Sequence, residues 1–256
     1  MFRNLLLGLA AFVAVGSCAG AGIAGPPLEI AAPSTPAPAG SAHGTADPTA
    51  EERGFVGWLR RTLSSREPYA LDDLPRRLAA GQEPVCLGDQ LVVHRGETVR
   101  YRGAVRVHPA FVERLERFEQ AVHDTAVEVY GRAPRRIQHA GTYSCRPVRG
   151  RDSRISEHAL GNAIDVRGFE FGPLPRNARE AAPEDLPVSL RRGFTVTVGR
   201  HWGGNGRNGE THERFLHTLT ERLERDRVFR GMIGPADPRH ANHLHLDAGP
   251  YRYSWL

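Results

Sequence analysis

Two short polar motifs, about eighty residues apart, constrain this chain more than any other feature. The first has the pattern S-x-H-x-x-G-x-A-x-D and the second H-x-x-H-x-H; their members are Ser156, His158, Gly161, Ala163 and Asp165, then His240, His243 and His245. Imidazoles and a carboxylate from such segments can supply three ligands to one Zn²⁺, and three protein ligands leave a fourth position open, as in catalytic zinc sites. The fold must therefore bring the two segments together.

The N-terminus has the layout of a secretory signal. Arg3 precedes an apolar run over 5–15, which is too short for an ordinary transmembrane span. The following V-G-S-C resembles a bacterial lipobox, in which Cys18 becomes the lipidated first residue of the mature protein. Ordinary cleavage near 19–21 or 22–24 is the alternative. We expect a signal peptide over 1–18 and a periplasmic or cell-envelope lipoprotein, held to the membrane only by its lipid.

A stretch rich in Pro, Ala and Gly follows the signal. Residues 19–51 contain too few large apolar side chains to form a core, so we expect a flexible tether before a domain over 52–256. The chain is 40% hydrophobic and 25% charged, which allows a packed core. The net charge is +5, but Arg is interspersed with Asp and Glu, so we expect a mixed solvated surface, no nucleic-acid binding and a monomer.

The chain has three cysteines. If Cys18 carries lipid, Cys86 and Cys145 remain as an even pair in an oxidising compartment, which predicts a disulfide between them. The alternative is two free buried thiols.

Hydrophobic periodicity predicts an α+β fold. Apolar residues have helical spacing in three segments: 51–64, 109–130 and 210–229. Four segments alternate as strands do: 136–142, 162–171, 194–198 and 242–247. A β-hairpin is expected over 91–107 with its turn near Arg95-Gly96, and loops over 144–156 and 172–187. Because no βαβ rhythm appears, we expect a small central antiparallel sheet flanked by helices.

The context of each motif indicates which side chains can meet. A turn at Gly161 would fold His158 back toward Asp165 at the start of a strand. His243 and His245 are two residues apart, and on a strand such residues point to the same face. Each pair also has an alternative interpretation without a metal: side chains that lie on the surface, or imidazoles that are buried in the core with their hydrogen bonds made to protein groups.

Taken together, the motifs resemble a known family. The segments TYSCRPVRG at 142–150, SEHALGNAIDV at 156–166 and HANHLHLD at 240–247 resemble the extensin-like C-terminal domain of bacterial secreted proteins. That domain is similar to the LAS-type zinc peptidases, which include D-Ala-D-Ala carboxypeptidases and dipeptidases, murein endopeptidases and the non-catalytic hedgehog signalling domain. The resemblance is sharp over 141–252 and weaker over 84–140, and it implies a LAS-like fold.

The resemblance also implies roles for individual residues. It makes His158, Asp165 and His245 the zinc ligands. Where some relatives have a catalytic Glu, this chain has Asn242, so His240 and His243 become the candidates for general base and proton shuttle.

Four other residues have candidate roles beside the ligands. Arg146 would hold the substrate carbonyl or stabilise an oxyanion. Ser156 would support the site or the substrate by hydrogen bonding, Trp202 would line a peptide groove, and Asp247 would hold a ligand imidazole. The alternatives are a solvated loop residue for Arg146 and a core residue for Trp202.

Several other residues receive plainer interpretations. Glu157 is disfavoured as a base because neighbouring side chains diverge on an extended backbone. His201, His212 and His217 are expected to be surface or helix histidines. The resulting expectation is a zinc metallopeptidase that acts on peptide bonds of peptidoglycan stems. The alternatives are a wall-binding or structural module that retains zinc without turnover, and a metal-free substrate-binding lipoprotein.

Overall fold

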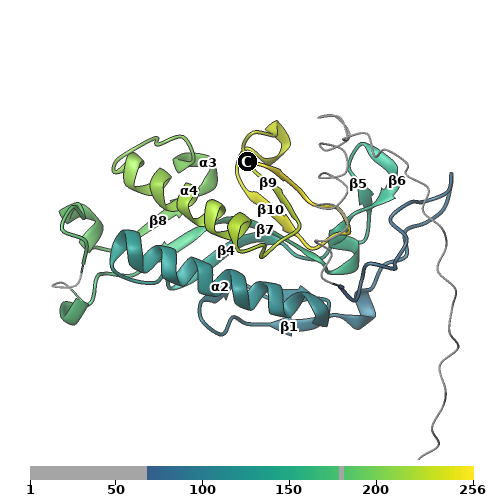
Figure 1. Ribbon diagram of the computed structural model, residues 1–256, viewed down its shortest axis with the longest axis horizontal. Helices are drawn as coiled ribbons and strands as arrows, with labels where there is room; N and C mark the ends of the chain where they lie inside the picture. Colours follow the sequence, from purple (N-terminus) through teal and green to yellow (C-terminus); the bar gives the residue numbers. More distant parts are fainter. Residues whose placement is uncertain (1–67, 179–181) are drawn as a thin grey trace, which may run out of the picture. The chain divides into compact units, whose positions relative to one another are not determined.

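The computed structural model describes residues 68–178 and 182–256. The expected signal, Cys18, the tether and the helix expected over 51–64 lie outside these residues. The described part is a mixed α+β structure, as the periodicity predicts (Figure 1). Among its helices, none is both long and apolar enough to cross a membrane.

Seven strands form the main sheet. In sheet order they are β11 (Tyr253–Trp255), β9 (Gly231–Ile233), β10 (Leu244–Asp247), β7 (Ala163–Phe171), β4 (Arg136–Gly141) and β2 (Arg100–Arg102), with β8 (Phe194–Thr197) also paired to β7. β2 is parallel to β4 and β11 is parallel to β9, while the other pairs are antiparallel. The sheet is therefore larger and more mixed than the expected antiparallel one.

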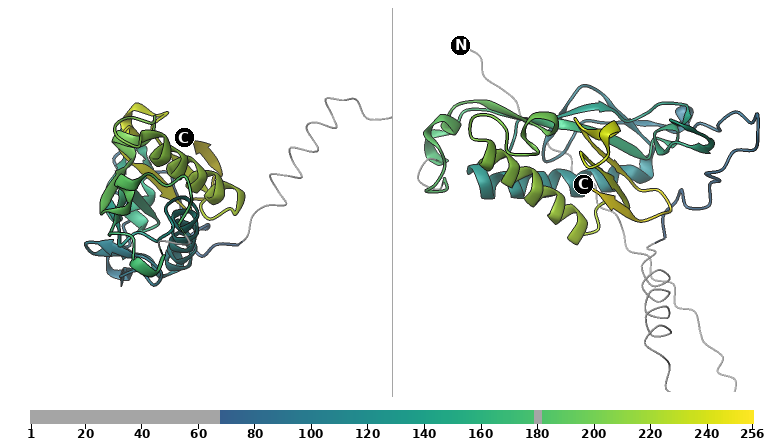
Figure 2. Two further views of the ribbon diagram at one scale, coloured as in Figure 1. Left: turned by 90° about the vertical axis from the view of Figure 1, so that its left-hand side faces the viewer. Right: turned by 90° about the horizontal axis from the view of Figure 1, so that it is seen from above.

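Among the described residues, the remaining elements are two small sheets, three α-helices and several 3₁₀ turns. They are β1 (Val92–His94) with β3 (Val105–Val107), β5 (Pro147–Val148) with β6 (Arg151–Ile155), α2 (Pro109–Tyr130), α3 (Val198–His201), α4 (Gly209–Arg225), and the 3₁₀ helices η1 (Gly88–Gln90), η2 (Glu157–Leu160), η3 (Arg176–Ala178), η4 (Val188–Arg191) and η5 (Pro238–His240). The helices α2 and α4 lie together on one face of the main sheet (Figure 2).

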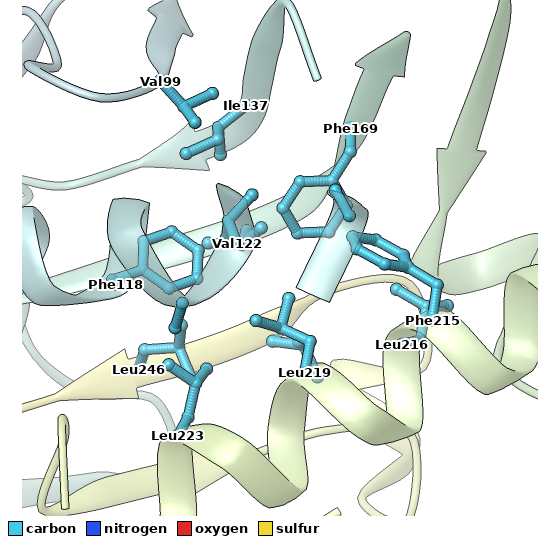
Figure 3. Close-up of a cluster of buried hydrophobic side chains, with 14 of the residues drawn as sticks. Val99, Phe118, Val122, Ile137, Phe169, Phe215, Leu216, Leu219, Leu223 and Leu246 are labelled. Carbon is cyan, nitrogen blue, oxygen red and sulfur yellow. The ribbon is translucent and has the colours of Figure 1, made fainter. Parts of the chain in front are cut away.

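Helix α2 has the bounds that the sequence predicts. Its start is fixed by His108, whose Nδ1 accepts a hydrogen bond from the Ala110 amide, and by Pro109 in the first turn. Gly131 ends it in the left-handed conformation, with φ 68°. Its apolar stripe packs against α4 and the sheet in one hydrophobic core (Figure 3). Labelled members of this core are Val99, Phe118, Val122, Ile137, Phe169, Phe215, Leu216, Leu219, Leu223 and Leu246.

Alternation along β10 and the first residues of β7 separates the core from the opposite face of the sheet, and a bulge at Arg167 shifts the pattern of β7 before Phe169. Leu244 and Leu246 are fully buried in the core, opposite Val166 and Ile164 of β7. His245, which lies between the two leucines, and Asp165, which lies between Ile164 and Val166, point away from the helices. We call this second face the site face; it carries Ala163, Asp165, His245 and Asp247.

Other sequence expectations need correction. The hairpin expected over 91–107 does not turn tightly near Arg95-Gly96: residues 92–94 pair with 105–107 across a longer connection, and residues 100–102 within it join β4. The expected loop over 144–156 contains the β5–β6 hairpin. Helix α4 ends at Arg225, before the predicted residue 229, because Arg227 takes a positive φ of 53° that breaks the helix. The short elements β9, β11 and α3 were not predicted.

Candidate metal centre

Three side chains from three elements converge on the site face. The atoms His158 Nε2, Asp165 Oδ1 and His245 Nδ1 form a nearly equilateral triangle. Its edges are 3.1 Å from His158 to Asp165, 3.2 Å from His158 to His245, and 3.0 Å from His245 to Asp165. All three side chains are largely buried. The structure thus brings together the three ligands implied by the resemblance.

The hydrogen-bond partners of the two imidazoles define their tautomers. His158 Nδ1 faces the carbonyl oxygen of Thr142 at 3.2 Å, so this nitrogen carries the proton. His245 Nε2 faces Asp247 Oδ2 at 3.0 Å and likewise carries the proton. In the neutral rings the other nitrogens therefore present lone pairs to each other and to the Asp165 carboxylate. Three acceptors that face one another in this way suit a cation.

The size and chemistry of the triangle fit zinc. Ligand atoms about 2.0–2.1 Å from a tetrahedral zinc ion lie about 3.3 Å from one another. The observed edges of 3.0 to 3.2 Å are close to this value. Two imidazoles and one carboxylate are also an established zinc ligand set with a fourth position left open.

Hydrogen bonds join the same three groups in this structure, because both imidazoles lie within hydrogen-bond distance of the Asp165 carboxylate. Burial opposes charge on Asp165, but hydrogen bonds from His158 and His245 hold its pKa far below the ordinary value. Burial also opposes charge on His245, but the hydrogen bonds to Asp165 and Asp247 raise its pKa to about 10. The site is therefore electrostatically organised to hold positive charge between these groups.

The position of His158 is set by η2. Ser156 caps this short helix, because its hydroxyl accepts a hydrogen bond from the His158 amide at 3.3 Å. Gly161 ends the helix with φ 63°, and a Cβ there would lie 2.7 Å from the His108 nitrogen, so a larger residue does not fit. The turn predicted at Gly161 is confirmed. Ser156 is buried and engaged in the cap, a position from which it supports η2.

Glu157, next to His158, is occupied elsewhere. Its carboxylate accepts hydrogen bonds from Arg76 Nε at 2.9 Å and from Asn162 Nδ2 at 2.6 Å. Tyr69 donates to the Asn162 amide oxygen at 2.6 Å. This network fixes η2 to residues 69–76 and leaves Glu157 unavailable as a base.

The loop after β4 orients His158 through its backbone. Thr142 supplies the carbonyl that accepts from His158, and its hydroxyl donates to the Arg106 carbonyl at 2.9 Å. Three residues later, Cys145 forms the predicted disulfide with Cys86. The amide of Ser144 in the same loop donates to the His158 carbonyl at 3.2 Å. The disulfide therefore holds the segment that positions His158.

Asp247 orients the other ligand imidazole. Its carboxylate is fully buried and accepts from His245 Nε2, from the Gly249 amide at 2.8 Å and from the Tyr253 hydroxyl. A buried carboxylate behind a ligand imidazole fixes the ring and raises its basicity. The role expected for Asp247 therefore matches its contacts.

The two other histidines of the second motif lie beside the triangle. His243 Nε2 is 3.8 Å from Asp165 Oδ1, while its Nδ1 donates to Asn242 Oδ1 at 2.8 Å. The His240 ring centroid lies 4.9 Å from that of His243 and 5.8 Å from that of His245. Burial lowers the pKa of both His240 and His243, which favours their neutral forms.

Arg146 follows the disulfide and borders the same site. It is half-buried, and its Nη1 donates to the Pro147 carbonyl at 3.0 Å. Its backbone carbonyl accepts from the Ser156 amide, which joins the loop to the start of η2. Burial lowers the pKa of Arg146 and the charge of Asp165 opposes this, so the two side chains interact electrostatically.

The structure places Trp202 elsewhere. Its indole stacks on His217 of α4 with ring centroids 4.4 Å apart and packs against the core, which supports the alternative of a core residue. His201 and His212 lie on helices as expected but are buried and not on the surface.

Sequence reasoning missed two residues that support the ligands. Thr142 contacts His158 through its backbone carbonyl, and because every residue has such a carbonyl, the residue type gives no sign of this role. Tyr253 reaches Asp247 from β11, a strand too short to be recognised by alternation.

Comparison with known proteins gives one finding. No curated protein and no solved structure matches the chain. One family model matches part of the chain. The matched segment begins before the region of sharp resemblance and ends before the second motif. Residues 69–173, which supply His158 and Asp165, match the family model described as the extensin-like protein C-terminus.

Proposed function

We propose that this chain is a zinc-dependent metallohydrolase of the LAS type that cleaves a peptide bond in peptidoglycan stem peptides. The observation that carries the proposal is the triangle of potential ligand atoms on His158, Asp165 and His245, with edges of 3.0 to 3.2 Å. These residues would hold the ion, and one coordination position would remain for chemistry. The resemblance of both motifs to the LAS-type peptidases supports the substrate class.

The side chains around the triangle suit hydrolysis. Zinc, when bound, would polarise a carbonyl and acidify water. His243 accepts a proton from the attacking water at Nε2, because its Nδ1 is engaged by Asn242. The His240 ring centroid lies 4.9 Å from that of His243, and His240 is the candidate that returns a proton to the leaving amine. Arg146 would hold the substrate carbonyl oxygen as negative charge develops there.

The proposed location follows from the N-terminal sequence. A signal, a lipobox at Cys18 and a tether would hold the domain at the bacterial cell envelope, within reach of wall peptides. The net charge of +5 favours approach to an anionic wall polymer.

A second candidate is a wall-binding or structural module that keeps zinc but does not turn over. The observation that favours it is Asn242, which stands where some relatives of the resemblance have a catalytic Glu. Its side chain hydrogen-bonds His243 and cannot accept a proton.

Zinc content and cleavage test the proposal together. We expect one zinc per chain after dialysis, and a chelator-sensitive product when muropeptides are analysed by mass spectrometry. His158→Ala or His245→Ala should abolish stoichiometric zinc, whereas His123→Ala, at a partly exposed position of α2, should not. One zinc without cleavage of cross-linked or uncross-linked muropeptides would favour the second candidate, and absence of zinc would refute both.

The base is tested separately from the metal. His243→Gln should retain one zinc and lower turnover by roughly 10²–10⁴-fold, the usual contribution of a positioned base. Turnover unchanged by this substitution would remove His243 from the mechanism.

A further inference from the structure

The site face continues from the metal centre to the edge strand β11. Trp255 pairs with Ile233, Ile233 pairs with His245, and His245 pairs with Asp165, so these residues form one row across four strands. Side chains directly opposite in neighbouring strands point to the same face. Because neighbouring strands lie about 4.8 Å apart, the Trp255 backbone lies about 10 Å from that of His245.

Tyr253 independently fixes which way the side chains of β11 point. Its hydroxyl donates to Asp247 on the site face. Ser254 pairs with Met232, a buried core residue, and so belongs to the opposite face. Strand alternation then returns Trp255 to the site face. Figure 1 shows β9 and β10 beside β7 near the C-terminus of the chain.

An exposed apolar surface therefore borders the metal centre. We call Tyr253 and Trp255, together with the half-buried Ile233 on the neighbouring strand β9, the aromatic shelf. Trp255 is 55% exposed and Tyr253 40%, although large aromatic side chains are normally buried. The Tyr253 hydroxyl is engaged by Asp247, so this residue offers its ring to solvent. Exposed patches of this kind mark binding sites.

Charge is distributed unevenly around the centre. None of the three shelf residues is charged. Arg167 follows Asp165 by two residues on β7, so it shares the site face, and it is exposed. Arg146 also borders the centre and interacts with Asp165.

We propose that the aromatic shelf is a subsite for a neutral sugar ring of the glycan attached to the substrate peptide. The inference rests on the proposed function and deepens it. A pyranose presents a C–H face that packs on a flat aromatic ring, while its hydroxyls remain in water. In a peptidoglycan fragment the neutral group is the sugar and the carboxylates belong to the peptide. The shelf and the two arginines match these two parts.

Saccharide binding tests the shelf without turnover. The probe is the tetramer of N-acetylglucosamine, titrated into the zinc-loaded full chain and followed by saturation-transfer NMR on the sugar. We expect Trp255→Ala to weaken binding about tenfold and Trp255→Phe about threefold or less, since phenylalanine preserves the aromatic face. Val93→Ala is the control, because Val93 is 54% exposed but lies on β1 outside the main sheet.

A kinetic comparison separates the subsite from the hydrolase. Trp255→Ala should raise KM more for a disaccharide-linked stem peptide than for the same peptide without sugar. Saccharide binding that is absent, or equal in wild type and Trp255→Ala, overturns the subsite even when peptides are cleaved. Loss of self-association in Trp255→Ala, with no saccharide effect, would instead make the shelf a contact between copies. Saccharide binding that depends on Trp255, without any peptide cleavage, would support the shelf and refute the hydrolase.

Discussion

Asp165 and His245 are direct partners across the ladder of β7 and β10, and the His245 Nδ1 lies 3.0 Å from Asp165 Oδ1. The pair faces away from the core because the residues flanking His245 are leucines buried beneath the helices. Strand pairing alone therefore brings Asp165 of the first motif beside His245 of the second. Only His158 needs a separate device, the capped turn of η2.

The carboxylate of Asp165 should be essential for metal affinity. Asp165→Asn keeps the side-chain volume but removes the charge, so we expect zinc affinity to fall by more than the roughly 10–100-fold typical of residues behind the ligands. Competition with a chromophoric chelator measures this, and circular dichroism checks the fold. Glu170→Gln makes the same chemical change on β7, where the carboxylate bonds Arg102 and Gln138, and should leave affinity unchanged. Equal affinities for both variants would remove Asp165 from the site.

Asp247 should raise the zinc affinity of the site indirectly, through its hydrogen bond with His245. Asp247→Asn leaves His245 in place but weakens the acceptor for its Nε2 proton, so we expect a zinc affinity about 10–100-fold lower. Tyr253→Phe removes one of the three hydrogen bonds to Asp247 and should have a smaller effect. The same titration measures both. A larger loss in Tyr253→Phe than in Asp247→Asn would contradict this order.

The disulfide should support both stability and the metal. Its cysteines are 59 residues apart, and closing a loop of this length is worth about 4 kcal/mol in the chain-entropy model. The double variant Cys86→Ser, Cys145→Ser should lower the free energy of unfolding in urea by about 2–4 kcal/mol. It should also weaken zinc, because the loop carrying Thr142 loses its covalent attachment. Reductant should destabilise the wild type but not the double variant; equal responses would show that the bond is absent.

His212 should make stability depend on pH. Burial lowers its pKa to about 4, and the charge of nearby His201 adds to this. The unfolded chain binds this proton near pH 6.5, so the unfolded state takes up protons first as pH falls. The stabilising contribution is therefore complete above pH 6.5 and is lost between pH 6.5 and about 4.

Chelator-treated protein isolates this effect from the metal. Urea unfolding at pH 7, 5.5 and 4.5 should show a smaller loss of stability in His212→Asn than in the wild type. An identical pH dependence in the two proteins would refute the assignment.

Sequence periodicity predicted the long elements and the two halves of the site. Helix α2 and strand β7 have nearly the predicted bounds because apolar residues recur along each element at the spacing of its secondary structure. The turn at Gly161 and the shared face of His243 and His245 also follow from local rules. His243, however, lies just before β10 begins, so its place beside Asp165 depends on the preceding loop as well as on the strand.

The rest of the site depends on distant pairings that have no local signature. β9 and β11 are three residues each, too short to show alternation. Ser156 was expected to support the site by hydrogen bonding, and Trp202 either to line a peptide groove or to be a core residue. The contacts that each makes, a helix cap for Ser156 and packing on His217 for Trp202, depend on the tertiary structure and could not be predicted from local sequence.

The alternation of β10 has a consequence for how variants of this chain can fail. A slip of β10 by one residue would place a leucine at the position of His245 and would put an imidazole into the core. Such a mispaired molecule would lose packing and one metal ligand at the same time. The amount of bound zinc would therefore be proportional to the fraction of molecules with correctly paired strands. Zinc retention would measure that fraction in a preparation.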